Sequence, residues 1–189
     1  MARAFDALSE AHRAFIARQA IFFVGSAAAA GRVNVSPKDT ASLRVLDANA
    51  VVYRDLTGSG NETAAHLGAD GRLTLMFCAF DGAPMILRLY GRGRTLPVGS
   101  AGFDALLAAA FGGEAPLGTR QLVRLDVDLV QTSCGFGVPR FAYRGERDNL
   151  ARWAAAKGPE GLVRYRRERN AVSLDGLPAA PADADEPPA

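Results

Sequence analysis

The residue types best suited to chemistry gather in one glycine-rich segment, Asp55–Thr63, which reads Asp-Leu-Thr-Gly-Ser-Gly-Asn-Glu-Thr. It follows a strand pattern that ends at Tyr53 and leads into a helical pattern over Ala64–Leu67. A glycine-rich turn at the start of a helix presents unpaired backbone N–H groups, which can hold a phosphate or another anion. Ser59 and Glu62 could instead satisfy those groups as a Ser-x-x-Glu capping box. The Thr-Gly-Ser-Gly run is more than a cap requires, which favours a ligand cradle over capping alone.

Two further segments carry candidate residues. Lys38 ends the strand pattern Arg32–Lys38. Its ammonium could neutralise a phosphate as a point charge, or Lys38 could be an ordinary solvated lysine at the end of a strand. In the segment Thr132–Pro139, small residues allow a ligand to approach the backbone, and Phe136 offers a flat apolar face. Cys134 in that segment has no histidine or aspartate partner nearby in the sequence, which argues against a catalytic nucleophile.

The rest of the composition excludes several classes of function. The only two histidines, His12 and His66, argue against a zinc or histidine-based catalytic site and favour surface or capping roles, and no metal site is expected. Cys78 and Cys134 follow no disulfide pattern and are expected to be free thiols. A net charge of +2 with dispersed arginines predicts no nucleic-acid partner. The chain lacks the ~18 consecutive apolar residues of a membrane span, and Met1–Ala20 lacks a secretory pattern, so we expect a cytoplasmic protein without a membrane partner.

The candidate residues must be positioned by a sheet of short strands. Alternation is clearest from Gln121 to Thr132, where Val123, Leu125, Val127 and Leu129 are predicted to face inward. Many short strands with tight turns favour an antiparallel barrel over a doubly wound parallel sheet, and no G-x-G-x-x-G follows a strand. The strand patterns cover Ile21–Ala27, Arg32–Pro37, Leu43–Leu46, Ala50–Tyr53, Leu73–Phe80, Ile86–Arg94 and Gln121–Thr132.

Helices are expected at both ends of this sheet region and within it. Helical spacing predicts an opening helix within Phe5–Arg18 and a short helix over Gly102–Phe111. Two further helical stretches near the C-terminus are separated by Gly158-Pro159, a strong helix breaker. We expect one domain over residues 1–170, followed by a disordered tail, rich in proline, alanine and aspartate, over residues 171–189.

The order of these segments resembles the pyridoxamine 5′-phosphate oxidase-like family. The similarity extends over about Phe15–Thr95 and includes Arg32–Lys38, Val51–Tyr53, the glycine-serine loop and Arg72–Phe77. It implies a mainly β fold with flanking helices, namely a six-stranded antiparallel FMN-binding split barrel. It also implies a homodimer that holds each flavin between its subunits.

The resemblance also assigns roles by position. Lys38 corresponds to the lysine that ends the family's second core strand near the FMN, and Ser36 and Pro37 line the isoalloxazine side. In the oxidases proper, the loop before the second helix carries Ser-Arg-Lys, whereas this chain has Asn61–Thr63 there. The family's glutamine on a later strand is replaced by Ile86. These departures argue against a true pyridoxamine phosphate oxidase.

We therefore expect an FMN-dependent oxidoreductase that acts on a small molecule of unknown identity. The alternative is a non-catalytic flavin, haem or F420 binding protein on the same dimeric barrel, which the missing Arg-Lys pair favours. The expected cofactor-binding residues are Ser36, Pro37, Lys38, Thr57, Gly58, Ser59, Asn61 and Glu62. The expected substrate-pocket residues are Arg88, Cys134 and Phe136.

Overall fold

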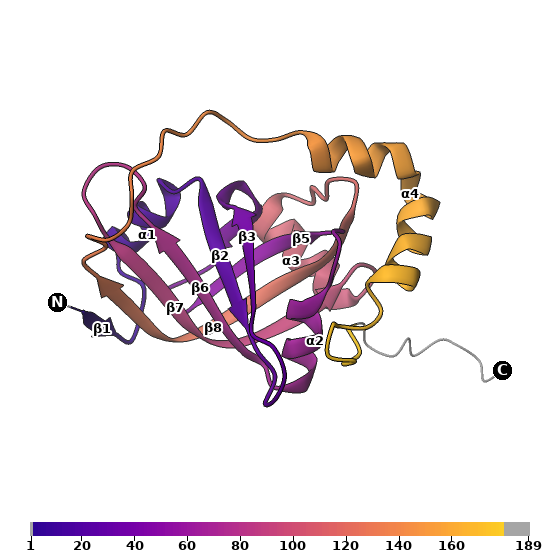
Figure 1. The fold of residues 1–189 in the computed structure, drawn as a ribbon, viewed down its shortest axis with the longest axis horizontal. Helices are drawn as coiled ribbons and strands as arrows, with labels where there is room; N and C mark the ends of the chain where they lie inside the picture. Colours follow the sequence, from indigo (N-terminus) through magenta and orange to yellow (C-terminus); the bar gives the residue numbers. More distant parts are fainter. Residues whose placement is uncertain (1, 180–189) are drawn as a thin grey trace.

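The strand patterns fold into one curved antiparallel sheet, shown in Figure 1 by a computed structural model that describes residues 2–179. The order across the sheet is β3-β2-β6-β7-β8-β5-β4, with β1 paired to β8. The strands are β1 (Arg3–Phe5), β2 (Ile21–Ser26), β3 (Asn34–Asp39), β4 (Leu43–Val45), β5 (Ala50–Leu56), β6 (Arg72–Cys78), β7 (Ile86–Pro97) and β8 (Thr119–Ser133).

The predicted mainly β, antiparallel split barrel with flanking helices is confirmed as a half-barrel sheet, but the strand count of six is wrong. The sheet has eight strands within the described residues. Two of them, β1 and β4, are only three residues long. β1 lies where the opening helix was predicted to begin, and its residue Arg3 pairs with Thr132 near the end of β8. The expected helix is shorter because Ser9 caps it and starts it at Glu10.

A bulge between β7 and β8 changes which residues face the core. Tyr90 pairs with Leu129 and Gly91 pairs with Val127, so Asp128 has no opposite residue on β7. The predicted inward alternation therefore holds through Val127 and then shifts, leaving Leu129 half-buried instead of buried. Gly91 is required at this bulge, because a Cβ there would lie 2.0 Å from the carbonyl oxygen of Asp126.

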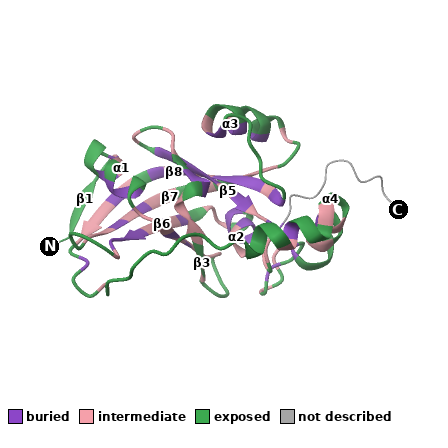
Figure 2. Ribbon diagram, turned by 90° about the horizontal axis from the view of Figure 1, so that it is seen from above, coloured by how far each residue is buried: buried purple, intermediate pink, exposed green. Residues whose placement is uncertain are grey.

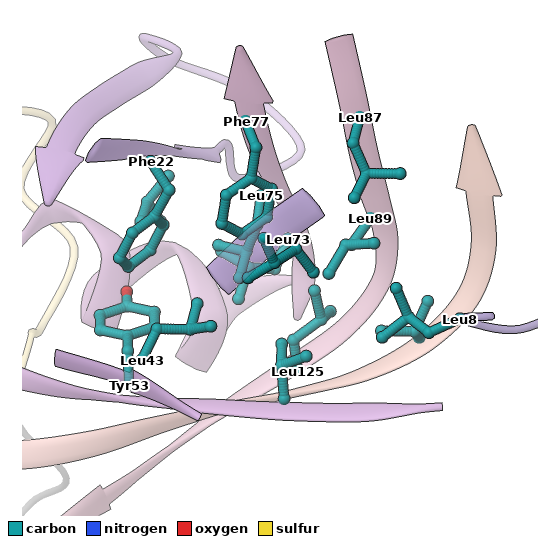
Figure 3. Close-up of a cluster of buried hydrophobic side chains, with 14 of the residues drawn as sticks. Leu8, Phe22, Leu43, Tyr53, Leu73, Leu75, Phe77, Leu87, Leu89 and Leu125 are labelled. Atoms are coloured by element: carbon teal, nitrogen blue, oxygen red, sulfur yellow. The ribbon is translucent and has the colours of Figure 1, made fainter. Parts of the chain in front are cut away.

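The main core fills the concave side of the sheet. Phe22 packs against Tyr53 with ring centroids 5.5 Å apart, and against Phe77 at 5.6 Å (Figure 3). Leu75 and Leu89 are also fully buried in this cluster. These side chains come from β2, β5, β6 and β7. Their burial therefore fixes the curvature that brings the last residues of β3 and β5 close to the first residues of β8.

Within the described residues, four α-helices lie around the sheet. They are α1 (Glu10–Ala17), α2 (Glu62–Ala69), α3 (Ala101–Phe111) and α4 (Asn149–Arg169). Figure 2 shows α3 on one face, where it buries a second apolar cluster, and α2 and α4 at one end of the sheet. Gly158, with φ of 66°, kinks α4 as predicted. No helix among residues 2–179 is both long and apolar enough to cross a membrane.

Two non-regular segments frame the sheet. The arm, residues 134–148, runs from β8 over the sheet to α4 and is exposed over most of its length (Figure 1). The C-terminal turn, residues 170–179, contains a bridge between Val172 and Pro178 and a buried Ser173. Residues 171–179 belong to the tail that was predicted to be disordered, and here Leu174 and Ala179 contact Glu62 and Asn61 of the glycine-rich loop. Residues 180–189 lie outside the described residues.

Candidate functional site

The buried carboxylate of Asp55 lies at the centre of a cluster of polar side chains at one end of the sheet. Its residue is 3% exposed and lies at the end of β5. One oxygen accepts from Lys38 Nζ at 2.6 Å, and the other accepts from Arg120 Nε at 2.8 Å and Gln121 Nε2 at 2.8 Å. Burial would raise the pKa of this carboxyl, but Lys38 and then Arg120 outweigh it and lower the pKa to about 2. Asp55 is therefore an anion under all ordinary conditions.

Arg120 and Gln121 extend this cluster to the glycine-rich loop. Arg120 Nη1 donates to the carbonyl of Gly60 at 2.9 Å and to Asn170 Oδ1 at 3.0 Å. Gln121 Nε2 also donates to Asn61 Oδ1 at 3.0 Å. The network thus connects β3, β5 and β8 with the loop and the C-terminal turn.

Lys38 connects the same network to a large cleft of about 1190 Å³. The cleft lies between α1, the start of β2, the end of β3, the β6–β7 turn and the arm. Lys38 lines the cleft and its side chain is 23% exposed, while its ammonium is held by Asp55 and lies 5.9 Å from the centroid of the buried Tyr53 ring. Pro37, the residue expected beside a flavin ring, also lines the cleft.

Cations and aromatic rings dominate the cleft wall. The cationic residues are Arg18, Lys38, Arg140, Arg144 and Arg147, against the acidic residues Asp39, Asp81 and Glu146. Phe141 donates its backbone N–H to the carbonyl of Phe80 at 3.0 Å, and the two rings pack with centroids 5.6 Å apart. These contacts hold the arm against the β6–β7 turn. A flat anionic molecule is the ligand class that such a wall suits.

The glycine-rich loop is placed apart from this cleft, beneath the C-terminal turn. The Thr57 hydroxyl donates to the carbonyl of Gly118 at 2.8 Å. Asn170 Nδ2 donates to the carbonyl of Gly58 at 3.1 Å, and Asn61 Nδ2 donates to the carbonyl of Ala179 at 3.0 Å. The chain's own residues therefore contact the side chains of Thr57 and Asn61 and the carbonyl of Gly58 in the loop that was expected to cradle a phosphate.

Ser59 and Glu62, the two loop residues considered for a capping box, lie in different environments. α2 begins at Glu62 with Asn61 as its N-cap, and no side chain caps it, so the alternative capping box from Ser59 is not formed. The Glu62 carboxylate instead accepts from the backbone N–H of Leu174 at 3.1 Å in the C-terminal turn. Ser59 is exposed. None of the loop residues lines the cleft.

Ser36 belongs to a short polar chain behind Lys38. Its hydroxyl lies 3.2 Å from Asn34 Nδ2, which also donates to Thr63 Oγ1 at 3.3 Å. Ser26 Oγ lies 3.5 Å from the same Thr63 oxygen and 3.1 Å from His66 Nδ1. The expected surface or capping role is wrong for His66, which is 1% exposed. His12 does cap α1.

The three expected substrate-pocket residues lie away from Lys38. Arg88 on β7 donates to Ser133 Oγ at 3.1 Å, while Cys134 is exposed and Phe136 is 81% exposed. None of the three lines the cleft. Cys78 is the buried thiol, and burial raises its pKa.

Sequence reasoning missed three of the site's polar residues, although two left a signal. Asp55 continues the period of two set by the buried Val51 and Tyr53, and Gln121 precedes Val123 in the same way on β8. A polar residue at an inward position of an otherwise apolar strand requires a buried partner. Arg120 is not at an inward position and left no such signal.

Comparison with known proteins supports a single family. The family model described as pyridoxamine 5′-phosphate oxidase matches residues 8–134. A pyridoxamine 5′-phosphate oxidase family protein of Aspergillus flavus, ustO, is 38% identical over 192 residues, covering 92% of this chain and 76% of that protein. The chain belongs to the pyridoxamine 5′-phosphate oxidase family. The resemblance over the first half of the sequence is thereby confirmed.

Solved structures share the fold of this family member. A HupZ variant from Group A Streptococcus aligns with a TM-score of 0.54 and 18% identity, over 66% of this chain and 98% of that chain. A Lactobacillus delbrueckii protein described as a candidate pyridoxamine 5′-phosphate oxidase aligns with a TM-score of 0.52 and 16% identity, over 67% of this chain and 94% of that chain. At these identities the likeness supports the split barrel alone.

Proposed function

We propose that this member of the pyridoxamine 5′-phosphate oxidase family binds flavin mononucleotide in the cleft beside Lys38 and works as an oxidoreductase on a small molecule. The observation that carries the proposal is the position of Lys38, a fixed cation in the wall of a cleft of about 1190 Å³. A cleft of this order accommodates a nucleotide-sized ligand. When bound, the isoalloxazine ring supplies the hydride or electron chemistry.

The residues of the cleft fit a flavin better than those of the loop do. Phe15, Ile21 and Phe80 supply apolar wall for a ring, and Lys38 with the arm arginines supplies charge for a phosphate. In the loop, the carboxylate of Glu62 would repel a phosphate. We therefore assign the phosphate to the Lys38 side and retain Pro37 as a neighbour of the ring, whereas Ser36 does not line the cleft.

A ligand held without turnover is the second candidate function. It is favoured by Asn61–Thr63, which replaces the Ser-Arg-Lys of the oxidases proper. F420 would suit the same cations and aromatic rings. Haem is supported less, because neither histidine lines the cleft and both are buried elsewhere.

The proposal includes a homodimer in the cytoplasm. Within residues 2–179, β3 pairs only with β2 and is an edge of the sheet, yet it exposes Val35 at 62%, and Val33 just before it is exposed at 72%. Apolar side chains on an unpaired sheet edge favour association with another protein surface. A second copy of this chain is the partner that we propose.

A flavin titration tests the proposal. The absorption spectrum of the purified protein is recorded first, and the apo protein is then titrated with FMN while flavin fluorescence is followed. We expect saturable quenching that is weakened about tenfold or more by Lys38→Ala, which removes a charged contact to the phosphate. Lys157→Ala is the matched control, since Lys157 is the chain's only other lysine and lies over Trp153 on α4. A colourless protein that is indifferent to FMN contradicts the proposal.

A further inference from the structure

Asp55 is shared between two cations that differ in their access to solvent. The Arg120 side chain is 8% exposed and the Lys38 side chain is 23% exposed. Arg120 is also held by the neutral acceptors Gly60 and Asn170. Two cations around one carboxylate leave one positive charge in excess, and Lys38 is the one of the two that lines the cleft. Lys38 is therefore the cation through which this excess charge would act on a ligand in the cleft.

A lysine without such a partner would not keep its ammonium in one place. Its four-carbon stem has many rotamers, and ordering it costs conformational entropy. Asp55 accepts one of the three ammonium protons at 2.6 Å, which leaves two protons for a ligand. Because Asp55 is itself fixed by Arg120 and Gln121 on β8, the position of the ammonium is set by the sheet.

We propose that Asp55 is the positioning residue of the ligand site, which holds Lys38 toward the cleft for the anionic group of the ligand. This inference rests on the proposed flavin function and extends it to a residue that does not line the cleft. For the strength of anion binding, it predicts the opposite of what the number of charges alone would predict. Removing the carboxylate makes the site more positive, which by charge alone would strengthen anion binding, whereas loss of positioning weakens it.

Chemical labelling of the lysines tests the positioning without any ligand. The protein is treated with acetic anhydride, and acylation of Lys38 and Lys157, its only lysines, is followed by peptide mass spectrometry. Since Asp55 holds the Lys38 ammonium, Asp55→Asn is expected to raise the Lys38 acylation rate about tenfold and to leave Lys157 unchanged. An unchanged Lys38 rate overturns the inference.

FMN titration of the same variants tests the link to binding. We expect Asp55→Asn to weaken FMN binding about tenfold, and Asp55→Asn with Lys38→Ala to bind no more weakly than Lys38→Ala alone. Asp126→Asn is the matched control, because it removes the same charge from an aspartate paired with Arg94 and Arg124. Tighter or equal binding by Asp55→Asn overturns the inference.

Two further outcomes, a variant that does not fold and a wild type that does not bind FMN, are distinguished as follows. If Asp55→Asn does not fold, Asp55→Glu is used instead, because it keeps the charge but displaces it by one methylene. Positioning by Asp55 then predicts faster Lys38 acylation and weaker FMN binding. Wild-type behaviour of Asp55→Glu overturns the inference. If the wild type does not bind FMN, the proposed function fails, and the labelling result still decides whether Asp55 positions Lys38.

Discussion

At the scale of single residues, Asp55 shows what allows a carboxylate to be buried in a β-sheet. An isolated buried charge is strongly unfavourable, and breaking a buried pair commonly costs about 3–5 kcal/mol. Here both carboxylate oxygens are satisfied, by Lys38 on one side and by Arg120 and Gln121 on the other. Burial together with the negative charge of Asp55 also raises the pKa of Tyr53, which stays a neutral phenol. The local charge state is therefore fixed at neutral pH.

The lowered pKa of Asp55 predicts how stability changes in acid. The folded pKa is about 2 against an ordinary value of 3.8, so this group stabilises the fold above pH 4 and loses that contribution as the pH falls toward 2. The contribution is roughly 2 kcal/mol. Urea unfolding at stepwise pH, compared between wild type and Asp55→Asn, is expected to show a difference that shrinks by this amount between about pH 5 and pH 2. A difference that is independent of pH would contradict the role of Asp55.

At the scale of elements, the C-terminal turn and the glycine-rich loop form one unit. Asn170 contacts Gly58 and Arg120, Leu174 contacts Glu62, and Ala179 contacts Asn61. The loop precedes α2 and the turn follows α4, and Figure 1 shows them together at one end of the sheet. The turn thus holds the loop next to the Asp55 network.

Asn170→Ala tests this unit. Asn170 is 3% exposed, and its removal leaves the Gly58 carbonyl and one Arg120 donor without this partner, which we expect to cost about 2 kcal/mol. Hydrogen exchange of residues 57–61 is also expected to become faster. Asn149→Ala, at the exposed first residue of α4, is the control. Equal stability and equal exchange in the two variants would show that the turn is not needed.

The elements were more predictable from the sequence than the site was. Strands and helices follow from local patterns, and the exceptions have local causes, such as the Gly91 bulge that moved Leu129. The site depends on contacts between residues that are far apart in the sequence. Lys38 and Asp55 are 17 positions apart, and Asn170 and Gly58 are 112 apart. No pattern within one segment encodes such pairs, so the contacts of the C-terminal turn with Gly58, Asn61 and Glu62 in the loop were not predicted.

At the scale of the whole molecule, the proposed association would occur through the edge strand β3, which exposes Val35. We expect a homodimer with twice the 19.9 kDa mass of the chain, and we expect Val35→Glu to shift it toward monomer, because the new charge would be buried in the contact. Val98→Glu is the control, since Val98 is similarly exposed at 51% but lies after β7. Static light scattering at micromolar concentration measures both. A monomeric wild type would contradict the dimer.

The position of the flavin is the central claim, and a crystal structure of the protein grown with FMN tests it most directly. We predict the phosphate beside Lys38, with Lys38 still paired to Asp55, and the ring against the cleft wall near Pro37 and Phe80. Flavin bound instead at residues 57–61 with the C-terminal turn displaced, or no flavin at saturating concentration, would contradict the claim.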